Sequence, residues 1–159
     1  MKFIASKKLS DNATLRAVIM WMLIALILAM GLNLAAKSID YGTTPTQWEN
    51  TILGNEAEFI DPLSFNDLLL AVHTELFGLL LVFILIASLS ARTSRPVIVK
   101  MGFLSITLLT LILYPVTLLT APWFGSISVV VAAYAFLLFH TLMIVSGADL
   151  LIALVRNKL

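Results

Sequence analysis

The sequence predicts an all-α integral membrane protein, a four-helix bundle of two hairpins with cytoplasmic N and C termini. Three observations predict it: an apolar composition, four apolar stretches of spanning length, and a one-sided distribution of basic residues. Of the 159 residues, 60% are hydrophobic and 12% are charged, and the mean hydropathy is +1.03. A soluble domain of this length needs more polar residues to cover its surface. Lipid is therefore expected to be the main solvent.

Four segments are long and apolar enough to cross a membrane, because a spanning helix needs about 20 mostly apolar residues. A single membrane domain, residues 1–159, is expected to hold them at about residues 17–36, 68–90, 101–121 and 127–155. The first apolar run is longer than the core of a cleaved signal peptide, and it is predicted to be a retained anchor. Trp48 and Trp123 are expected at the membrane interface.

The basic residues set the predicted orientation. One side of the membrane would hold Lys2, Lys7, Lys8, Arg16, Arg92, Arg95, Lys100, Arg156 and Lys158. The other side holds Lys37 and an acidic loop, residues 38–66. Under the positive-inside rule, both termini and the loop 91–100 are cytoplasmic and the acidic loop is outside. The predicted location is a bacterial-type inner membrane.

The connections between the spans predict some local structure. The linker "APWFGS" is so short that the third and fourth spans are expected to be antiparallel neighbours. The acidic loop is expected to pack over the outer mouth of the bundle and to hold a short helix near residues 46–59, capped by Thr46 with Glu49 three residues later. Pro115 is predicted to kink the third span. Tyr114 beside it could offer a hydroxyl to the interior, but the kink is the favoured interpretation.

The two histidines of the chain, His73 and His140, are the main candidate site residues. Each lies in a span that runs from outside to inside, and an intramembrane ionisable residue is by default a functional hypothesis. The pair could be the axial ligands of a haem in the bundle, with Gly147 leaving room for the macrocycle. They could equally hydrogen-bond across helices or form a proton path. By residue count they lie at different depths, about 8 Å and about 20 Å into their spans.

The four-span layout with His73 and His140 resembles the four-helix membrane b-type cytochromes with paired histidine ligands. The resemblance implies haem b and electron transfer between a quinone pool and a partner at the outer surface. The acidic loop would dock a basic partner such as a soluble cytochrome. Two other classes stay open: a non-catalytic accessory or assembly subunit of a larger membrane complex, and a proton- or ion-conducting subunit.

Two acidic residues inside the spans need partners of their own. Glu75 is about 200° around its helix from His73, so the two side chains address different neighbours. Glu75 is expected to bond Asn33 or Lys37, with proton coupling or contact to a quinone as the functional alternative.

Asp149 is expected to form a structural ion pair near the cytoplasmic end. Arg156 lies seven residues further on, and Arg92 or Arg95 could reach it from the other hairpin. Such a pair would lock the hairpins together, because charges in membranes pair with one another.

Several classes of function are excluded or unsupported. The chain has no cysteine, which excludes disulfides, thiolate zinc sites, iron–sulfur clusters and covalent c-type haem. It has no phosphate-binding glycine loop and no zinc-protease or nucleophile-elbow motif. Its basic residues are split among three short segments, so nucleic-acid binding is unsupported. No catalytic residue is predicted, and an electron carrier or subunit is favoured over a stand-alone enzyme.

Overall fold

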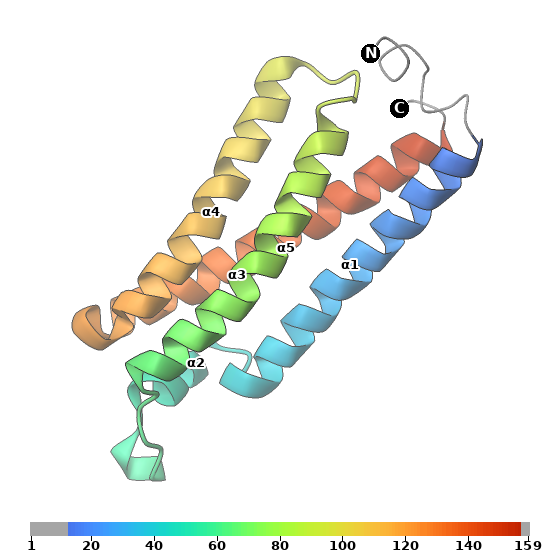
Figure 1. Ribbon diagram of the computed structural model, residues 1–159. Helices are drawn as coiled ribbons and strands as arrows, with labels where there is room; N and C mark the ends of the chain where they lie inside the picture. Colours follow the sequence, from blue (N-terminus) through green and yellow to red (C-terminus); the bar gives the residue numbers. More distant parts are fainter. Residues whose placement is uncertain (1–12, 157–159) are drawn as a thin grey trace.

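The computed structural model describes residues 13–156, and within that range it is helical apart from short connections (Figure 1). The elements are α1 (Ala13–Tyr41), α2 (Pro45–Leu53), the short 3-10 helix η2 (Glu56–Glu58), α3 (Phe65–Ser90), α4 (Val97–Phe124) and α5 (Ser126–Val155). Four of them, α1, α3, α4 and α5, are long and apolar enough to cross a membrane. The predicted all-α membrane bundle with four spans is confirmed. Lys2, Lys7, Lys8 and Lys158 lie outside the described residues.

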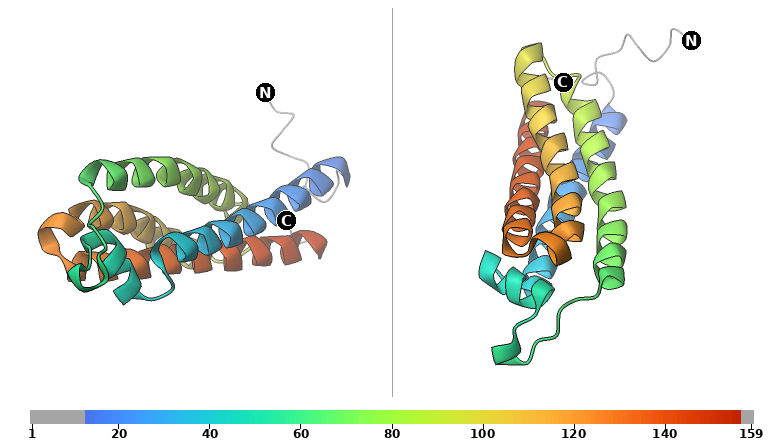
Figure 2. Two further views of the ribbon diagram at one scale, coloured as in Figure 1. Left: turned by 90° about the horizontal axis from the view of Figure 1, so that it is seen from below. Right: turned by 90° about the vertical axis from the view of Figure 1, so that its left-hand side faces the viewer.

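The helix α5 is the centre of the bundle. It packs against all the other long helices, α1, α3 and α4, and also against α2. The two spans of the first predicted hairpin mainly contact different neighbours, since α1 packs on α5 and α3 packs on α4. Figure 2 shows α2 and η2 at one end of the bundle and the α3–α4 connection at the other.

The N-cap of the short helix α2 lies two residues earlier than predicted. Thr44 is the N-cap, and it exchanges hydrogen bonds with Gln47 in a capping box. Pro45 is the first helical residue, where its fixed φ suits a helix start. The predicted cap at Thr46 with Glu49 is therefore wrong. Glu49 instead accepts a hydrogen bond from the Ser126 hydroxyl at the start of α5.

The predicted loop helix is also interrupted. At Gly54 the backbone has φ +82°, a value in the region that favours glycine. An added Cβ there would lie 2.9 Å from the Ile60 carbonyl oxygen. The chain therefore turns after Leu53, and η2 is a separate turn.

The acidic loop packs on the bundle through Trp48. This contact agrees with the expectation that the loop covers one end of the bundle. Trp48 is 5% exposed, and its ring lies 5.1 Å from that of Tyr41 and 5.7 Å from that of Phe136. Its indole N–H donates to the Gly42 carbonyl at 3.0 Å. Trp48 is thus buried inside the fold, whereas Trp123 is 68% exposed, as an interfacial residue would be.

The charges separate along the bundle axis. The acidic residues of α2, η2 and their flanking loops lie at the end where α1 finishes and α3 starts, whereas Arg92, Arg95 and Lys100 lie around the α3–α4 connection and Arg156 ends α5. The fold therefore keeps the one-sided pattern from which the orientation is predicted. Which end faces the cytoplasm stays a prediction.

Candidate functional site

A buried ion pair joins two helices near the acidic end of the bundle. Lys37, in the last turns of α1, is 4% exposed, and its ammonium pairs with the Glu75 carboxylate of α3. The second carboxylate oxygen of Glu75 accepts a hydrogen bond from the Tyr114 hydroxyl of α4. Lys37, Glu75 and Tyr114, here called the polar cluster, therefore tie three helices together.

The polar cluster lies well inside the spans. At 1.5 Å per residue, Glu75 is about 15 Å from the start of α3, and Tyr114 is about 15 Å from the end of α4. The backbone of Lys37 lies nearer the end of α1, and its long side chain extends to the depth of the Glu75 carboxylate. Removing two charges from water is costly, and the cost is offset only when they pair closely with each other and with further donors. The Tyr114 hydroxyl is such a donor.

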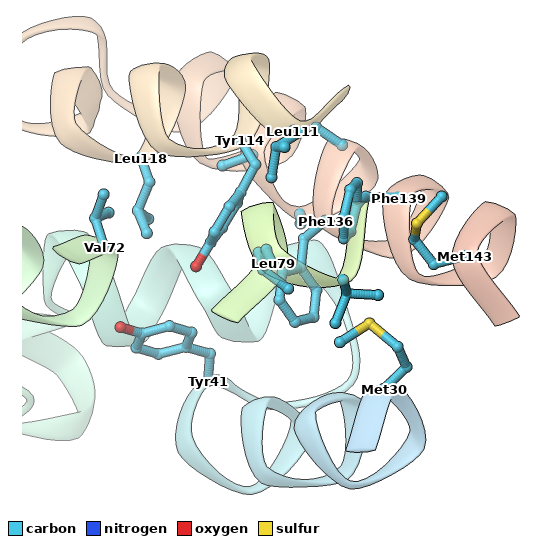
Figure 3. Close-up of a cluster of buried hydrophobic side chains, with 14 of the residues drawn as sticks. Met30, Tyr41, Val72, Leu79, Leu111, Tyr114, Leu118, Phe136, Phe139 and Met143 are labelled. Atoms are coloured by element: carbon cyan, nitrogen blue, oxygen red, sulfur yellow. The ribbon is translucent and has the colours of Figure 1, made fainter. Parts of the chain in front are cut away.

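Aromatic rings surround the Lys37 ammonium. The nitrogen lies 4.2 Å from the ring centroid of Tyr41 and 5.8–5.9 Å from those of Trp48, Tyr114 and Phe136. Figure 3 shows Tyr41 and Tyr114 projecting from α1 and α4 into the same interior region. The electron-rich faces of such rings attract a cation and replace part of its lost hydration.

His140 of α5 lies directly beside Phe136, one of the aromatic rings around the Lys37 ammonium. It is fully buried, and its ring is 4.0 Å from that of Phe136. Its Nδ1 donates to the Phe136 carbonyl at 2.8 Å, and its Nε2 lies 2.9 Å from the amide oxygen of Asn33, one turn before Lys37. Both ring nitrogens have protein partners, so His140 joins α5 to α1.

The structure does not bring His73 to His140. The buried residues of α3 are Leu68, Val72, Leu79, Val82 and Ile86, and His73 is exposed on another face of the helix. Axial ligands must face each other at one depth, and both nitrogens of His140 are already engaged. The two residues as arranged do not fit a haem held between them, so we derive no step through haem.

Gly147 does not open a space for a macrocycle either. A Cβ built on it would lie 3.0 Å from Cγ1 of Ile27, so α1 fills that space. Among residues 13–156, no group of three or more His, Cys, Asp or Glu side chains could hold a metal ion. The predicted cofactor, haem b, stays a prediction.

Asp149 forms an ion pair with Arg95 of the α3–α4 connection, one of the alternative partners expected from the sequence, rather than with Arg156. Arg156 lies two turns, about 10 Å, further along the same helix. The α3–α4 connection folds back beside Asp149 and brings Arg95 closer. Both side chains are partly exposed, at 53% for Arg95 and 39% for Asp149.

A cavity of about 230 Å³ adjoins the polar cluster between α1, α2 and α5. Polar and aromatic residues share its lining with apolar ones: Leu34, Lys37, Ser38, Gly42, Thr43, Thr44, Pro45, Trp48, Ala133, Tyr134, Phe136 and Leu137. Tyr134 and Leu137 are 60% and 45% exposed, so this side of the cavity borders the lipid-facing surface.

The sequence identified part of this site. Of the two partners expected for Glu75, the structure pairs it with Lys37. Asn33, the other predicted partner, bonds His140 instead. The role of Tyr114 was underestimated. A hydroxyl at membrane depth indicates a residue that needs a polar partner. From the sequence, a kink at the neighbouring Pro115 was the favoured interpretation of this segment.

One family model matches the chain. The family Aq_1264_TM, described as a transmembrane helical domain, matches residues 42–159. This range contains α2 to α5, with Glu75, Tyr114 and His140, while Lys37 and Asn33 lie before it in α1. No curated protein and no solved structure matches the chain. The match covers three of the four spans and fits a membrane helical bundle.

Proposed function

We infer the function from the premise that the chain belongs to the Aq_1264_TM family of transmembrane helical domains, and we propose that it binds the head group of a lipid-soluble quinone. The observation that carries the proposal is Lys37, a buried lysine among the residues that line an aromatic-walled cavity next to the lipid-facing surface. A mostly apolar pocket with a few convergent polar groups is the default binding site of a protein.

The lining of the cavity matches the chemistry of a quinone ring. The ring is flat and carries two carbonyl acceptors, so it needs aromatic or apolar walls and a hydrogen-bond donor. Trp48 and Phe136 supply the walls, and Lys37 supplies a charged donor. The volume lies below the roughly 300–1,000 Å³ of sites for drug-sized ligands, so it suits a head group rather than a whole lipid.

The surroundings give the rest of the ligand a place. A quinone tail is apolar and stays in the bilayer, and Tyr134 and Leu137 place the cavity beside lipid. Glu75 pairs with the ammonium through one carboxylate oxygen, and the Tyr114 hydroxyl holds the other oxygen of that carboxylate. Lys37 would therefore be preorganised before the ligand binds, which limits the entropy lost on binding.

The proposal is tested by titrating the detergent-purified chain with a short-chain ubiquinone analogue while measuring tryptophan fluorescence. We expect saturable quenching that disappears in Trp48→Phe and persists in Trp123→Phe, the matched control on the outer surface. Lys37→Met together with Glu75→Gln removes the donor without leaving a buried charge. It should weaken binding about tenfold or more, because losing a charged hydrogen bond is worth about 1.5–3 kcal/mol.

Two outcomes would overturn the proposal. One is quenching that rises linearly without saturation in every variant, which is partition into the micelle. The other is equal saturation with a naphthalene that lacks carbonyl groups, because the Lys37 donor would then contribute nothing.

A second candidate, an accessory subunit of a larger membrane complex, is favoured by one separate observation. His73 is exposed on α3 at membrane depth, and a polar side chain facing lipid is costly unless another helix covers it. A photocrosslinking residue placed at position 73 in native membranes should then give a discrete adduct. The same residue at Leu109, an exposed apolar position on α4, should not.

The remaining hypotheses gain less support. The polar residues do not continue through the bundle along α5, whose buried residues beyond His140 are Met143, Gly147, Leu150 and Leu154. This apolar run does not favour a proton or ion path. Electron transfer through haem b, with a soluble cytochrome as partner, stays a prediction that a reduced-minus-oxidised visible spectrum would test.

A further inference from the structure

We propose that a second cavity, at the opposite end of the bundle, binds the phosphate of an anionic phospholipid. This cavity of about 200 Å³ lies where the α3–α4 connection meets α5. Its polar side includes Arg95, Lys100 and Thr93, and its apolar side includes Phe103 and Val145.

The two cations are held in place with donors to spare. The Lys100 ammonium donates to the backbone carbonyls of Ala91 and Thr93 at 3.2 and 3.1 Å. An ammonium has three protons, so one stays available. Arg95 bonds Asp149 through one terminal nitrogen, and a guanidinium has five donors in all. Both side chains can therefore bind a phosphate without breaking their present bonds.

The charge of this end favours an anion. Asp149 lines the cavity and opposes one, but Arg95 neutralises it. Lys100 then remains in excess. A neighbouring cavity shares Arg95 and adds Arg156. Basic pockets between transmembrane helices at the membrane surface are a recurrent binding mode for anionic lipid head groups.

The apolar side of the cavity identifies the ligand as a lipid. Phe103 is half-buried, whereas Val99 and Val145 are 51% and 58% exposed on the outer surfaces of α4 and α5. An acyl chain can lie along these residues while its phosphate meets Arg95 and Lys100. A free phosphate compound would leave that apolar wall unused.

The test is the apparent midpoint of thermal unfolding of the full chain in a neutral detergent, with increasing mole fractions of phosphatidylglycerol. Phosphatidylcholine with the same acyl chains and soluble glycerol 3-phosphate are the two comparison ligands. We expect a saturable rise with phosphatidylglycerol alone. Arg95→Gln and Lys100→Gln should each raise the half-saturating mole fraction about fivefold, the change expected for one basic residue near a membrane surface.

Arg92→Gln is the matched control, because Arg92 is an exposed arginine of the same connection that does not line the cavity. It should leave the half-saturating mole fraction unchanged. If Lys100→Gln unfolds the chain, Arg95→Gln decides alone. Three results would overturn the proposal: an equal rise with phosphatidylcholine, a saturable rise with glycerol 3-phosphate, or an effect of Arg92→Gln as large as that of Arg95→Gln.

Discussion

At the scale of single residues, the polar groups of the candidate site have partners from other helices, whereas the buried Thr107 and Thr110 hydroxyls donate to carbonyls of their own helix. Lys37 has Glu75, Glu75 also has Tyr114, and His140 has Asn33. Across residues 13–156, no buried side-chain nitrogen or oxygen lacks a hydrogen-bond partner. A substitution at one of these positions therefore acts mainly through the partner that it leaves behind.

The ion pair predicts strong coupling between Lys37 and Glu75. Lys37→Met should lower the free energy of unfolding by about 3–5 kcal/mol, because it leaves a buried carboxylate without its cation. Adding Glu75→Met should recover much of that loss, since replacing a whole buried pair with apolar groups is often close to neutral. A double-mutant cycle of reversible unfolding in mixed micelles measures the coupling. Additive effects of the two substitutions would contradict it.

The two histidines should behave differently. His140→Ala removes a fully buried ring and strands Asn33, so it should cost about 2–4 kcal/mol of unfolding free energy, as cavity-forming and unsatisfying substitutions do. His73→Ala changes an exposed side chain and should stay within about 0.5 kcal/mol. The same unfolding measurement compares them. Equal losses would show that His73 also has a partner in the folded chain.

The polar residues inside the spans could be identified from the sequence, but the helix face on which each of them lies could not always be predicted. Depth along the spans reduced the expected partners of Glu75 to Asn33 or Lys37. The face on which His73 lies could not be predicted, because α3 is apolar on all sides and its pattern does not separate the interior from the lipid-facing side. The same uncertainty made Asn33 a candidate partner for Glu75 rather than for His140.

At the scale of elements, two helix ends differ from the predicted ones. In each case a charged or polar residue near the helix end makes contacts that extend the helix. The first span was expected to end at residue 36, before Lys37, but α1 continues to Tyr41 because Lys37 is buried in its ion pair. The second span was expected to start at residue 68. A capping box between Ser64 and Asp67 starts α3 at Phe65 instead.

Close contact between α1 and α5 at Gly147 gives the prediction at this scale. Gly147→Ala places a methyl group about 3.0 Å from Ile27 Cγ1, and such overpacking costs about 1–3 kcal/mol. Ile27→Ala removes that atom, so the double variant should lose less than the sum of the two single losses. Gly102→Ala on α4 is the matched control, since nothing lies within 4 Å of its added Cβ. It should be neutral or stabilising by up to about 1 kcal/mol, and a loss like that of Gly147→Ala would contradict the contact.

At the scale of the whole molecule, the order of the helices was the part that the sequence could not give. The short linker between the last two spans forces α4 and α5 together. The longer connection between α1 and α3 allows those helices to pack on different partners. Small residues of α5 among its buried positions, Ala132, Ala133, Ala135 and Gly147, let its neighbours approach closely, as is typical of helix contacts in membranes. The position of α5 at the centre follows from this.

The orientation of the whole bundle is predicted from its charges and can be measured directly, because the chain has no native cysteine. Glu58→Cys places a thiol in η2, and Ser94→Cys places one in the α3–α4 connection; both positions are exposed. With the basic end in the cytoplasm, a membrane-impermeant maleimide added to intact cells should label Glu58→Cys, and should label Ser94→Cys only after lysis. The opposite pattern would put the cavity beside Lys37, the proposed quinone site, on the cytoplasmic side. It would also put the proposed lipid-binding cavity in the outer leaflet.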